Sequence, residues 1–415
     1  MRVVSGFVVS HLFRSSSQTA AWSLYWALGV HCYAPGILQT LPCDNGPPPE
    51  DALCFALCCS DYALAVLDAQ CPEFVETLRL PTNCENGANW VPQARPMAQE
   101  DIFARLQERL GRVHARQRLG IESDHEAQIF GQGINFFHPE NWYSVHAGIR
   151  TLLKLTGLYW RGQKNTERIA IRHNYIERQD VPPKFEGFTI LQLSDLHADM
   201  NPGPMRRLVE VLGEVKYDVC VLTGDYRGET FGPFDAALEG VALVRSCLKQ
   251  PVYGVLGNHD TIRMVPALEE MGIRMLLNES ETITLDGQRI HLAGIDDAHY
   301  YRADNIQNAA SKIPHDEFSI LLSHTPEIYR QAAHADFKLL LSGHTHGGQI
   351  CLPGSIPITL DSVLPRHMGR GPWNYHNMAG YTSVGVGSSI VAVRFNCPPE
   401  ITLHHLQRPS LLPLR

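Results

Sequence analysis

Five short apolar runs in the second half of the chain each end abruptly in polar residues. They lie at residues 189–193, 219–222, 252–256, 318–322 and 339–341. A short run of leucine, isoleucine and valine bounded by turn residues is typical of a strand covered on both faces. Helical patterns at about 204–215, 234–248 and 265–271 lie among these runs. This arrangement predicts an α/β fold built from βαβ units.

The residues that follow these runs are of the types that bind metal ions. In chain order they are Asp195-Leu196-His197, Gly224-Asp225, Gly257-Asn258-His259-Asp260, His324 and Gly343-His344-Thr345-His346. For one such pair, a capping carboxylate or a hydrogen-bonded core histidine is the ordinary interpretation. Five in this order are improbable by chance, and open α/β sheets bind ligands at the carboxyl ends of their strands. We therefore predict that the five run ends meet around bound metal.

This ordered set of motifs resembles the signature of the calcineurin-like metallophosphoesterase family. The signature reads Asp-x-His, Gly-Asp, Gly-Asn-His-Asp, a single His and Gly-His-x-His, and every position of it is filled. The resemblance covers residues 186–408, a little over half of the chain. It implies a four-layer α/β/β/α sandwich, preceded here by a largely helical N-terminal extension, and an enzyme that hydrolyses phosphate esters.

The resemblance also implies two divalent metal ions. One ion would be held by Asp195, His197, Asp225 and His346, and the other by Asp225, Asn258, His324 and His344, with Asp225 as the bridge. Carboxylate, imidazole and amide ligands without a thiolate suit manganese, iron or zinc, and the bacterial members of the family favour manganese. Two such ions lower the pKa of a shared water, so direct attack of metal-bound hydroxide on phosphorus needs no side-chain nucleophile.

Three further positions receive roles beside the metals. We expect His259 to stabilise developing charge or to protonate the leaving alkoxide, with Asp260 orienting its other ring nitrogen. For Asp260 the alternative is an N-cap of a helix that begins near Thr261. Arg227 is the candidate to contact the substrate phosphate together with Asn258 and His259, and a solvated loop arginine is the alternative.

The closing segment, residues 385–403, resembles one bacterial subgroup of the family. That subgroup includes proteins related to UDP-2,3-diacylglucosamine hydrolases, which belong to lipid A biosynthesis, and phosphodiesterases of the cell envelope. The resemblance implies a phosphodiester or pyrophosphate of a lipid or nucleotide-sugar type as substrate. Two alternatives stay open: a general phosphomonoesterase or nucleotide phosphodiesterase for soluble compounds, and a metal-free protein-binding scaffold.

The N-terminal part divides into a cysteine-rich extension, residues 1–98, and a helical region, residues 99–185. The extension holds seven of the eleven cysteines, an odd number without Cys-x-x-Cys spacing, so the sequence neither requires nor excludes disulfides there. The four cysteines of the catalytic part lie far apart, which fits free thiols. Apolar stretches at 3–13 and 20–41 are interrupted and fall short of about 18 clean apolar residues.

In the helical region the sequence predicts amphipathic helices at about 98–120 and 141–159. The second combines an apolar face with Arg150, Lys154 and terminal aromatic residues, which suits a helix in a membrane interface. Packing on the catalytic domain is the alternative. We expect a cytoplasmic or peripherally membrane-associated bacterial protein, with an N-terminal signal or anchor as the alternative. The net charge of −8 argues against nonspecific nucleic-acid binding, and the sequence points to no protein partner.

Overall fold

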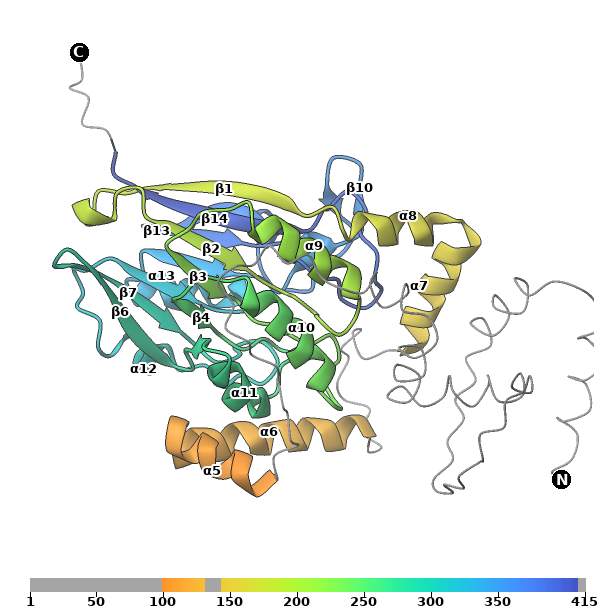
Figure 1. Ribbon diagram of the computed structural model, residues 1–415, viewed down its shortest axis with the longest axis horizontal. Coiled ribbons are helices and arrows are strands. Elements are labelled where there is room, and N and C mark those ends of the chain that lie inside the picture. Colours follow the sequence, from red (N-terminus) through yellow and green to blue (C-terminus); the bar gives the residue numbers. More distant parts are fainter. Residues whose placement is uncertain (1–98, 131–142, 410–415) are drawn as a thin grey trace, which may run out of the picture. The chain divides into compact units, whose positions relative to one another are not determined.

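The computed structural model of the chain describes residues 99–130 and 143–409, so the expectations for residues 1–98 lie outside the described residues. Two six-stranded sheets form its centre (Figure 1). The helices are α5 Gln99–Leu110, α6 Arg112–Phe130, α7 Tyr143–Leu155, α8 Leu158–Asn165, α9 Pro202–Leu212, α10 Asp235–Ser246, α11 Val265–Glu270, α12 Ile306–Ala310 and α13 Tyr329–His334. Short 3-10 turns include η3 Ile262–Met264, η4 Pro326–Ile328 and η5 His346–Gly348.

The first sheet has the strand order β1-β14-β2-β3-β4-β5. Its strands are β1 Ala170–Glu177, β2 Thr189–Leu193, β3 Val219–Leu222, β4 Val252–Gly254, β5 Arg274–Met275 and β14 Glu400–Gln407. Strands β2 to β5 run parallel, and β14 is antiparallel to β2. Because β1 pairs with β14 along its whole length, this sheet begins well before the predicted domain start at residue 186. The strand escaped prediction because it is an edge strand whose residues are mostly polar and exposed.

The second sheet has the order β12-β13-β9-β8-β7-β6. Its strands are β6 Glu279–Leu285, β7 Gln288–Gly294, β8 Ser319–Leu322, β9 Leu339–Ser342, β12 Gly371–Tyr375 and β13 Met378–Thr382. The four inner strands are parallel, and each edge is closed by an antiparallel hairpin. A separate two-stranded sheet joins β10 Cys351–Leu352 to β11 Ile356–Pro357.

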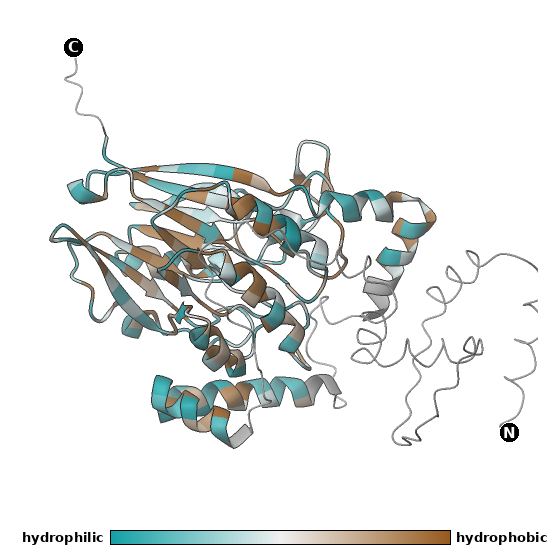
Figure 2. Cartoon of the chain, in the orientation of Figure 1, coloured by the Kyte–Doolittle hydropathy of each residue, from teal (hydrophilic) through white to brown (hydrophobic). Residues whose placement is uncertain are grey.

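The buried side chains show how these elements stack into layers. In β3, Val219 and Val221 belong to the core between the two sheets, whereas Cys220 and Leu222 face the core shared with α9, α10 and α11. In β9, Leu340 points instead to a third core, which includes residues of α12 and α13. Figure 2 shows the central strands of the sheets largely apolar, as burial on both faces requires, whereas the edge strand β1 is largely hydrophilic. The predicted four-layer α/β/β/α sandwich is therefore confirmed.

Helices α5 and α6 replace the single helix predicted at 98–120. Gly111, with φ of +82°, separates them. Helix α6 is held to the catalytic part by Arg118, which is fully buried and forms an ion pair with Asp296 as well as one with Glu122 of its own helix. The guanidinium of Arg118 also donates to the backbone carbonyl of Asp260, in one of the predicted metal-site motifs. This helix is thus part of the structure that supports the site.

Helices α7 and α8 replace the second helix, predicted at 141–159. Gly157, with φ of +71°, separates them, and α8 continues past the predicted end to Asn165. Leu152, Leu155 and Trp160 are exposed by 62, 81 and 62%. Among the described residues, every helix is too short or too polar to span a bilayer. The four cysteines of the described part are free, as predicted.

Candidate active site

The polar residues that end β2, β3 and β4 of one sheet meet those that end β8 and β9 of the other. All seven predicted metal ligands lie in this one place and are buried. Their donor atoms form two groups, each within 4.8 Å: Asp195, His197, Asp225 and His346 in the first, and Asp225, His324 and His344 in the second. Asp225 belongs to both, in the position predicted for a bridge.

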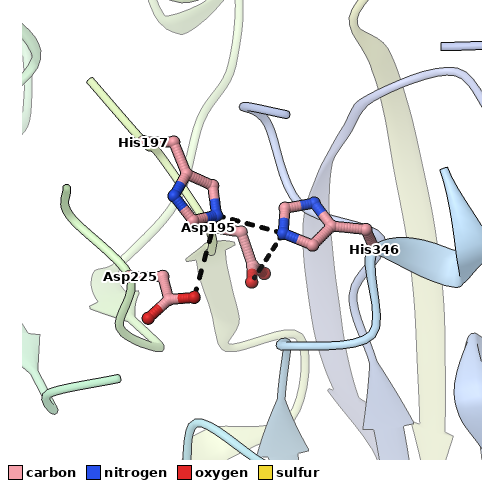
Figure 3. A group of neighbouring side chains, drawn as sticks. All are labelled: Asp195, His197, Asp225 and His346. Carbon is pink, nitrogen blue, oxygen red and sulfur yellow. Dashed lines mark hydrogen bonds and ion pairs between the residues drawn. The ribbon is translucent and has the colours of Figure 1, made fainter. Parts of the chain in front are cut away.

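In the first group two imidazoles approach each other above two carboxylates (Figure 3). The Nε2 atoms of His197 and His346 are 3.0 Å apart. His197 Nε2 lies 3.7 Å from Asp225 Oδ2, and His346 Nε2 lies 3.6 Å from Asp195 Oδ1. Four potential ligand atoms therefore surround one small volume.

In the second group the amide oxygen of Asn258 lies between two imidazoles. Asn258 Oδ1 is 2.9 Å from His324 Nε2 and 2.8 Å from His344 Nδ1. His324 Nε2 is also 3.2 Å from Asp225 Oδ2. The predicted amide ligand thus joins the second group at hydrogen-bond distance.

The backbone at the site is bent into an unusual conformation. Five of the predicted ligands have positive φ, at 51° for Asp195, 41° for His197, 55° for Asp225, 72° for His344 and 48° for His346. Residues with a Cβ rarely adopt this left-handed region, and such strain concentrates at functional sites. The surrounding loops therefore hold these side chains in directions that a relaxed backbone would not give.

Glycines at the site allow the loops to come close together. A Cβ on Gly343 would lie 1.9 Å from Ser194 Oγ and 2.4 Å from Asp195 Oδ2. A Cβ on Gly257 would lie 2.1 Å from Asp225 Oδ1. The glycines of the Gly-His-x-His and Gly-Asn-His-Asp motifs are thus required by the approach of a neighbouring carboxylate.

Backbone carbonyls determine which ring nitrogen faces the centre. His197 Nδ1 lies 2.8 Å from the carbonyl oxygen of Arg227, and His324 Nδ1 lies 2.8 Å from that of Thr223. A carbonyl oxygen only accepts, so each Nδ1 carries a proton, and in the neutral ring the lone pair is on Nε2. Both rings therefore offer a ligand atom to the centre.

The electrostatics of the site suit a cation. Burial lowers the pKa of His197 to about 4, so its imidazole is neutral at physiological pH. Burial acts in the same direction on His324, but the Asp225 carboxylate outweighs it and raises the pKa of His324 to about 10. The pKa of Asp225 is held well below its usual value despite burial, chiefly by His324. A divalent cation can displace the shared proton and satisfy the same carboxylate, so this buried Asp/His cluster is suited to divalent metal ions.

Asp260 does not have the expected arrangement. Its carboxylate accepts backbone hydrogen bonds from Gly257 and Asp225 at 2.8 Å and from Tyr226 at 2.9 Å, while Thr261 caps the following turn η3. The His259 nitrogen that Asp260 was expected to orient lies beside Thr230. Both predictions for Asp260 are therefore wrong, because two loops aim their N–H groups at its carboxylate.

Arg227 is also placed differently. It is buried, and its guanidinium donates to the backbone carbonyls of His259, Thr230 and Gly232. Neither the predicted phosphate contact nor a solvated arginine agrees with this arrangement, since the donors are directed to the protein backbone.

Three residues of the site were not foreseen. Thr230 contacts His259, Arg394 Nη2 lies 3.3 Å from His346 Nδ1, and the His299 and His344 rings have centroids 4.4 Å apart. Each lies outside the recognisable motifs in sequence, so only the three-dimensional structure identifies it.

The amino-acid sequence is similar to a family model and to known bacterial proteins. A model of the family "Calcineurin-like phosphoesterase" matches residues 188–348. The chain is similar to the uncharacterized metallophosphoesterases YkoQ and YkuE of Bacillus subtilis. Identity to YkoQ is 28%, covering 61% of this chain and 97% of YkoQ. Identity to YkuE is 31%, covering 58% of this chain and 86% of YkuE.

A further relative is named a phosphodiesterase. This is YaeI of Escherichia coli, 27% identical over 53% of this chain and 82% of YaeI. Among solved structures, the calcineurin-like phosphoesterase YfkN of Bacillus subtilis aligns with a TM-score of 0.31 and 13% identity, covering 48% of this chain and 81% of that one. The chain belongs to the calcineurin-like phosphoesterase family, and it is a metallophosphoesterase, a hydrolase of phosphate ester bonds.

Proposed function

We propose that the protein is a dinuclear metal-dependent phosphodiesterase. The observation that carries the proposal is the pair of donor groups that share Asp225. Asp195, His197, Asp225 and His346 would hold one divalent ion, and Asp225, Asn258, His324 and His344 the other. When bound, two such ions lower the pKa of a shared water for direct attack and neutralise charge on the phosphoryl oxygens. Manganese is the proposed metal, with iron or zinc accepted by the same ligand types.

His259 supplies the proton that the leaving group needs. It is buried, and its Nε2 lies 4.0 Å from Asp225 Oδ2, which places this nitrogen toward the donor cluster. An imidazole beside a metal ligand rather than among the ligands is suited to general acid catalysis. The proposed metal ligands and His259 together then account for activation of the water, neutralisation of charge on the phosphoryl oxygens and protonation of the leaving group.

The proposed substrate is a lipid-linked or nucleotide-sugar phosphodiester or pyrophosphate at a membrane surface, such as UDP-2,3-diacylglucosamine. Exposed Leu152, Leu155 and Trp160 on α7 and α8 support contact with lipid, and basic Arg150 and Lys154 lie on the same segment. The name of the relative YaeI supports a diester as the bond cleaved.

A panel of substrates tests the proposal. The full chain with Mn²⁺ is assayed on UDP-2,3-diacylglucosamine in mixed micelles, on bis(4-nitrophenyl) phosphate and on 4-nitrophenyl phosphate. We expect cleavage of both diester-type compounds, with the lipid-linked one turned over best. Turnover confined to the monoester would instead establish the phosphomonoesterase alternative, and absence of both metal and turnover would favour the scaffold.

A further inference from the structure

A threonine contacts the ring of the proposed proton donor. Thr230 Oγ1 lies 2.9 Å from His259 Nδ1, and both side chains are buried. Thr230 comes from the loop after β3, five residues beyond Asp225, whereas His259 comes from the loop after β4. The contact therefore joins two of the loops that form the site.

Arg227 holds the backbones of both partners. Its Nε donates to the His259 carbonyl at 2.5 Å, and its Nη2 donates to the Thr230 carbonyl. One planar guanidinium thus binds the backbone carbonyls of the two residues, Thr230 and His259, whose side chains contact each other. This explains why Arg227 is buried, and it makes the Thr230–His259 distance a property of a rigid framework.

The groups around the ring give its two nitrogens different surroundings. Nδ1 faces the Thr230 hydroxyl, whereas Nε2 faces Asp225 Oδ2 at 4.0 Å. The His197 ring lies edge-on with a centroid distance of 5.3 Å. Rotation of the His259 ring by half a turn would exchange the positions of its nitrogens and carbons. A hydrogen bond on Nδ1 opposes that rotation and keeps Nε2 directed to the reaction centre.

We propose that Thr230 is a positioning residue that orients His259 for proton transfer to the leaving group. As an acid, the His259 ring carries a proton on each nitrogen, and Nδ1 keeps its proton after Nε2 has given its own to the leaving group. The Thr230 hydroxyl oxygen can therefore accept from Nδ1–H before and after the transfer and hold the ring in one orientation. The role expected for Asp260 is thus taken by a neutral side chain from another loop. This inference rests on the proposed function, because it needs His259 to act as the acid.

The test compares leaving groups in Thr230→Val, which keeps the shape and removes the hydroxyl. Substrates are methyl 4-nitrophenyl phosphate, whose nitrophenolate leaves without help, and methyl phenyl phosphate, whose phenolate needs a proton. We expect Thr230→Val to lower kcat on the phenyl ester about 10- to 100-fold, with a change of about 3-fold or less on the nitrophenyl ester. Thr230→Ser should restore most of the loss. Thr402→Val is the matched control, since Thr402 is buried in β14 and bonds to Tyr381.

A second measurement does not depend on turnover. In metal-free protein labelled with ¹⁵N-histidine, the ring resonances that vanish in His259→Gln belong to His259. Their shifts should change in Thr230→Val and stay unchanged in Thr402→Val. Equal losses on both esters, or unchanged His259 resonances, would overturn the positioning role. Failure of the proposed function appears differently, as a wild-type protein that cleaves neither ester with Mn²⁺.

Discussion

Asp260 accepts a hydrogen bond from the backbone N–H of Asp225 at 2.8 Å, although the two residues end different strands. The same carboxylate accepts from Gly257, so one side chain holds the loop after β3 against the loop after β4. The proposed bridging ligand is therefore positioned through its backbone by a carboxylate that takes no part in the donor groups. Asp260 thus supports the donor cluster through the backbone without contributing a ligand atom to it.

Asp260→Asn should weaken metal binding. The amide keeps one acceptor but turns an N–H₂ group toward backbone donors, so the loops separate. We expect Mn²⁺ affinity to fall about 10- to 100-fold, the usual effect of losing a group that orients ligands, when titrated by calorimetry. Asp218→Asn is the control, because Asp218 also accepts a backbone N–H, from Thr189, outside the site. Equal affinities for Asp260→Asn and wild type would contradict this role.

Gly343→Ala should abolish activity. Its Cβ would overlap Ser194 and press against the Asp195 carboxylate, which displaces a ligand and the strand end that carries it. We expect less than about 1% of wild-type turnover, since a misplacement of about 1 Å can cost about 100-fold. Gly120→Ala is the matched change inside α6, with open space around the added methyl. It should be neutral or stabilise by about 0.5–1 kcal/mol. An active Gly343→Ala protein would show that the loops are less tightly apposed than described.

Stability near helix α6 should depend on pH through Asp296. Burial alone would raise the pKa of Asp296, but Arg118 and His114 outweigh it and lower the pKa. The ionised form therefore stabilises the fold above the unfolded pKa of about 4, and this stabilisation is lost as pH falls through the lower folded value.

Asp296→Asn should cost about 3 kcal/mol at pH 7, because it leaves Arg118 buried without one of its two charged partners. Urea unfolding measured between pH 7 and pH 3 checks this. The difference from wild type should be constant above about pH 5 and shrink below about pH 4. A difference that does not change with pH would mean that the ion pair contributes no charge-dependent stability.

Membrane contact should depend on the exposed apolar residues of α7 and α8. Leu155→Glu combined with Trp160→Glu removes two of the largest exposed apolar side chains there and adds negative charge. We expect binding to anionic vesicles to fall at least about tenfold in a flotation assay, with turnover on methyl 4-nitrophenyl phosphate unchanged. Val363→Glu is the control, because Val363 is an even more exposed apolar residue on a loop outside these helices. Retention of vesicle binding by the double variant would remove these helices from the proposal.

The meeting of the proposed ligands at one place was predictable from sequence because their signal is local. Each apolar run ends beside its polar motif, and the strand ends of a parallel sheet share one edge, so Asp195 and His346 could be placed together from order alone. The supporting contacts were not predictable in this way. Asp260 binds backbone N–H groups about 35 residues earlier in sequence, and Arg227 binds the carbonyl of His259 in the next loop. These hydrogen-bond partners depend on how closely the loops approach one another in space, and the residue pattern contains no information on that distance.

The same limit applies to the fold. The buried strands are visible in the sequence as apolar runs, whereas β1 is a polar edge strand that is recognisable only from its pairing with β14. Helix boundaries at Gly111 and Gly157 were missed because the apolar spacing continues across each glycine. Only the left-handed backbone conformation shows the break.

Counting metal ions in the wild-type protein and in Asp225→Asn tests the central claim most directly. After loading with Mn²⁺ and removal of excess metal, elemental analysis of the wild-type chain should give two ions per chain. Asp225→Asn should lose at least one of the two, together with essentially all phosphodiesterase turnover, while retaining its circular dichroism spectrum. Two ions and undiminished turnover in the variant would contradict a centre bridged by this carboxylate.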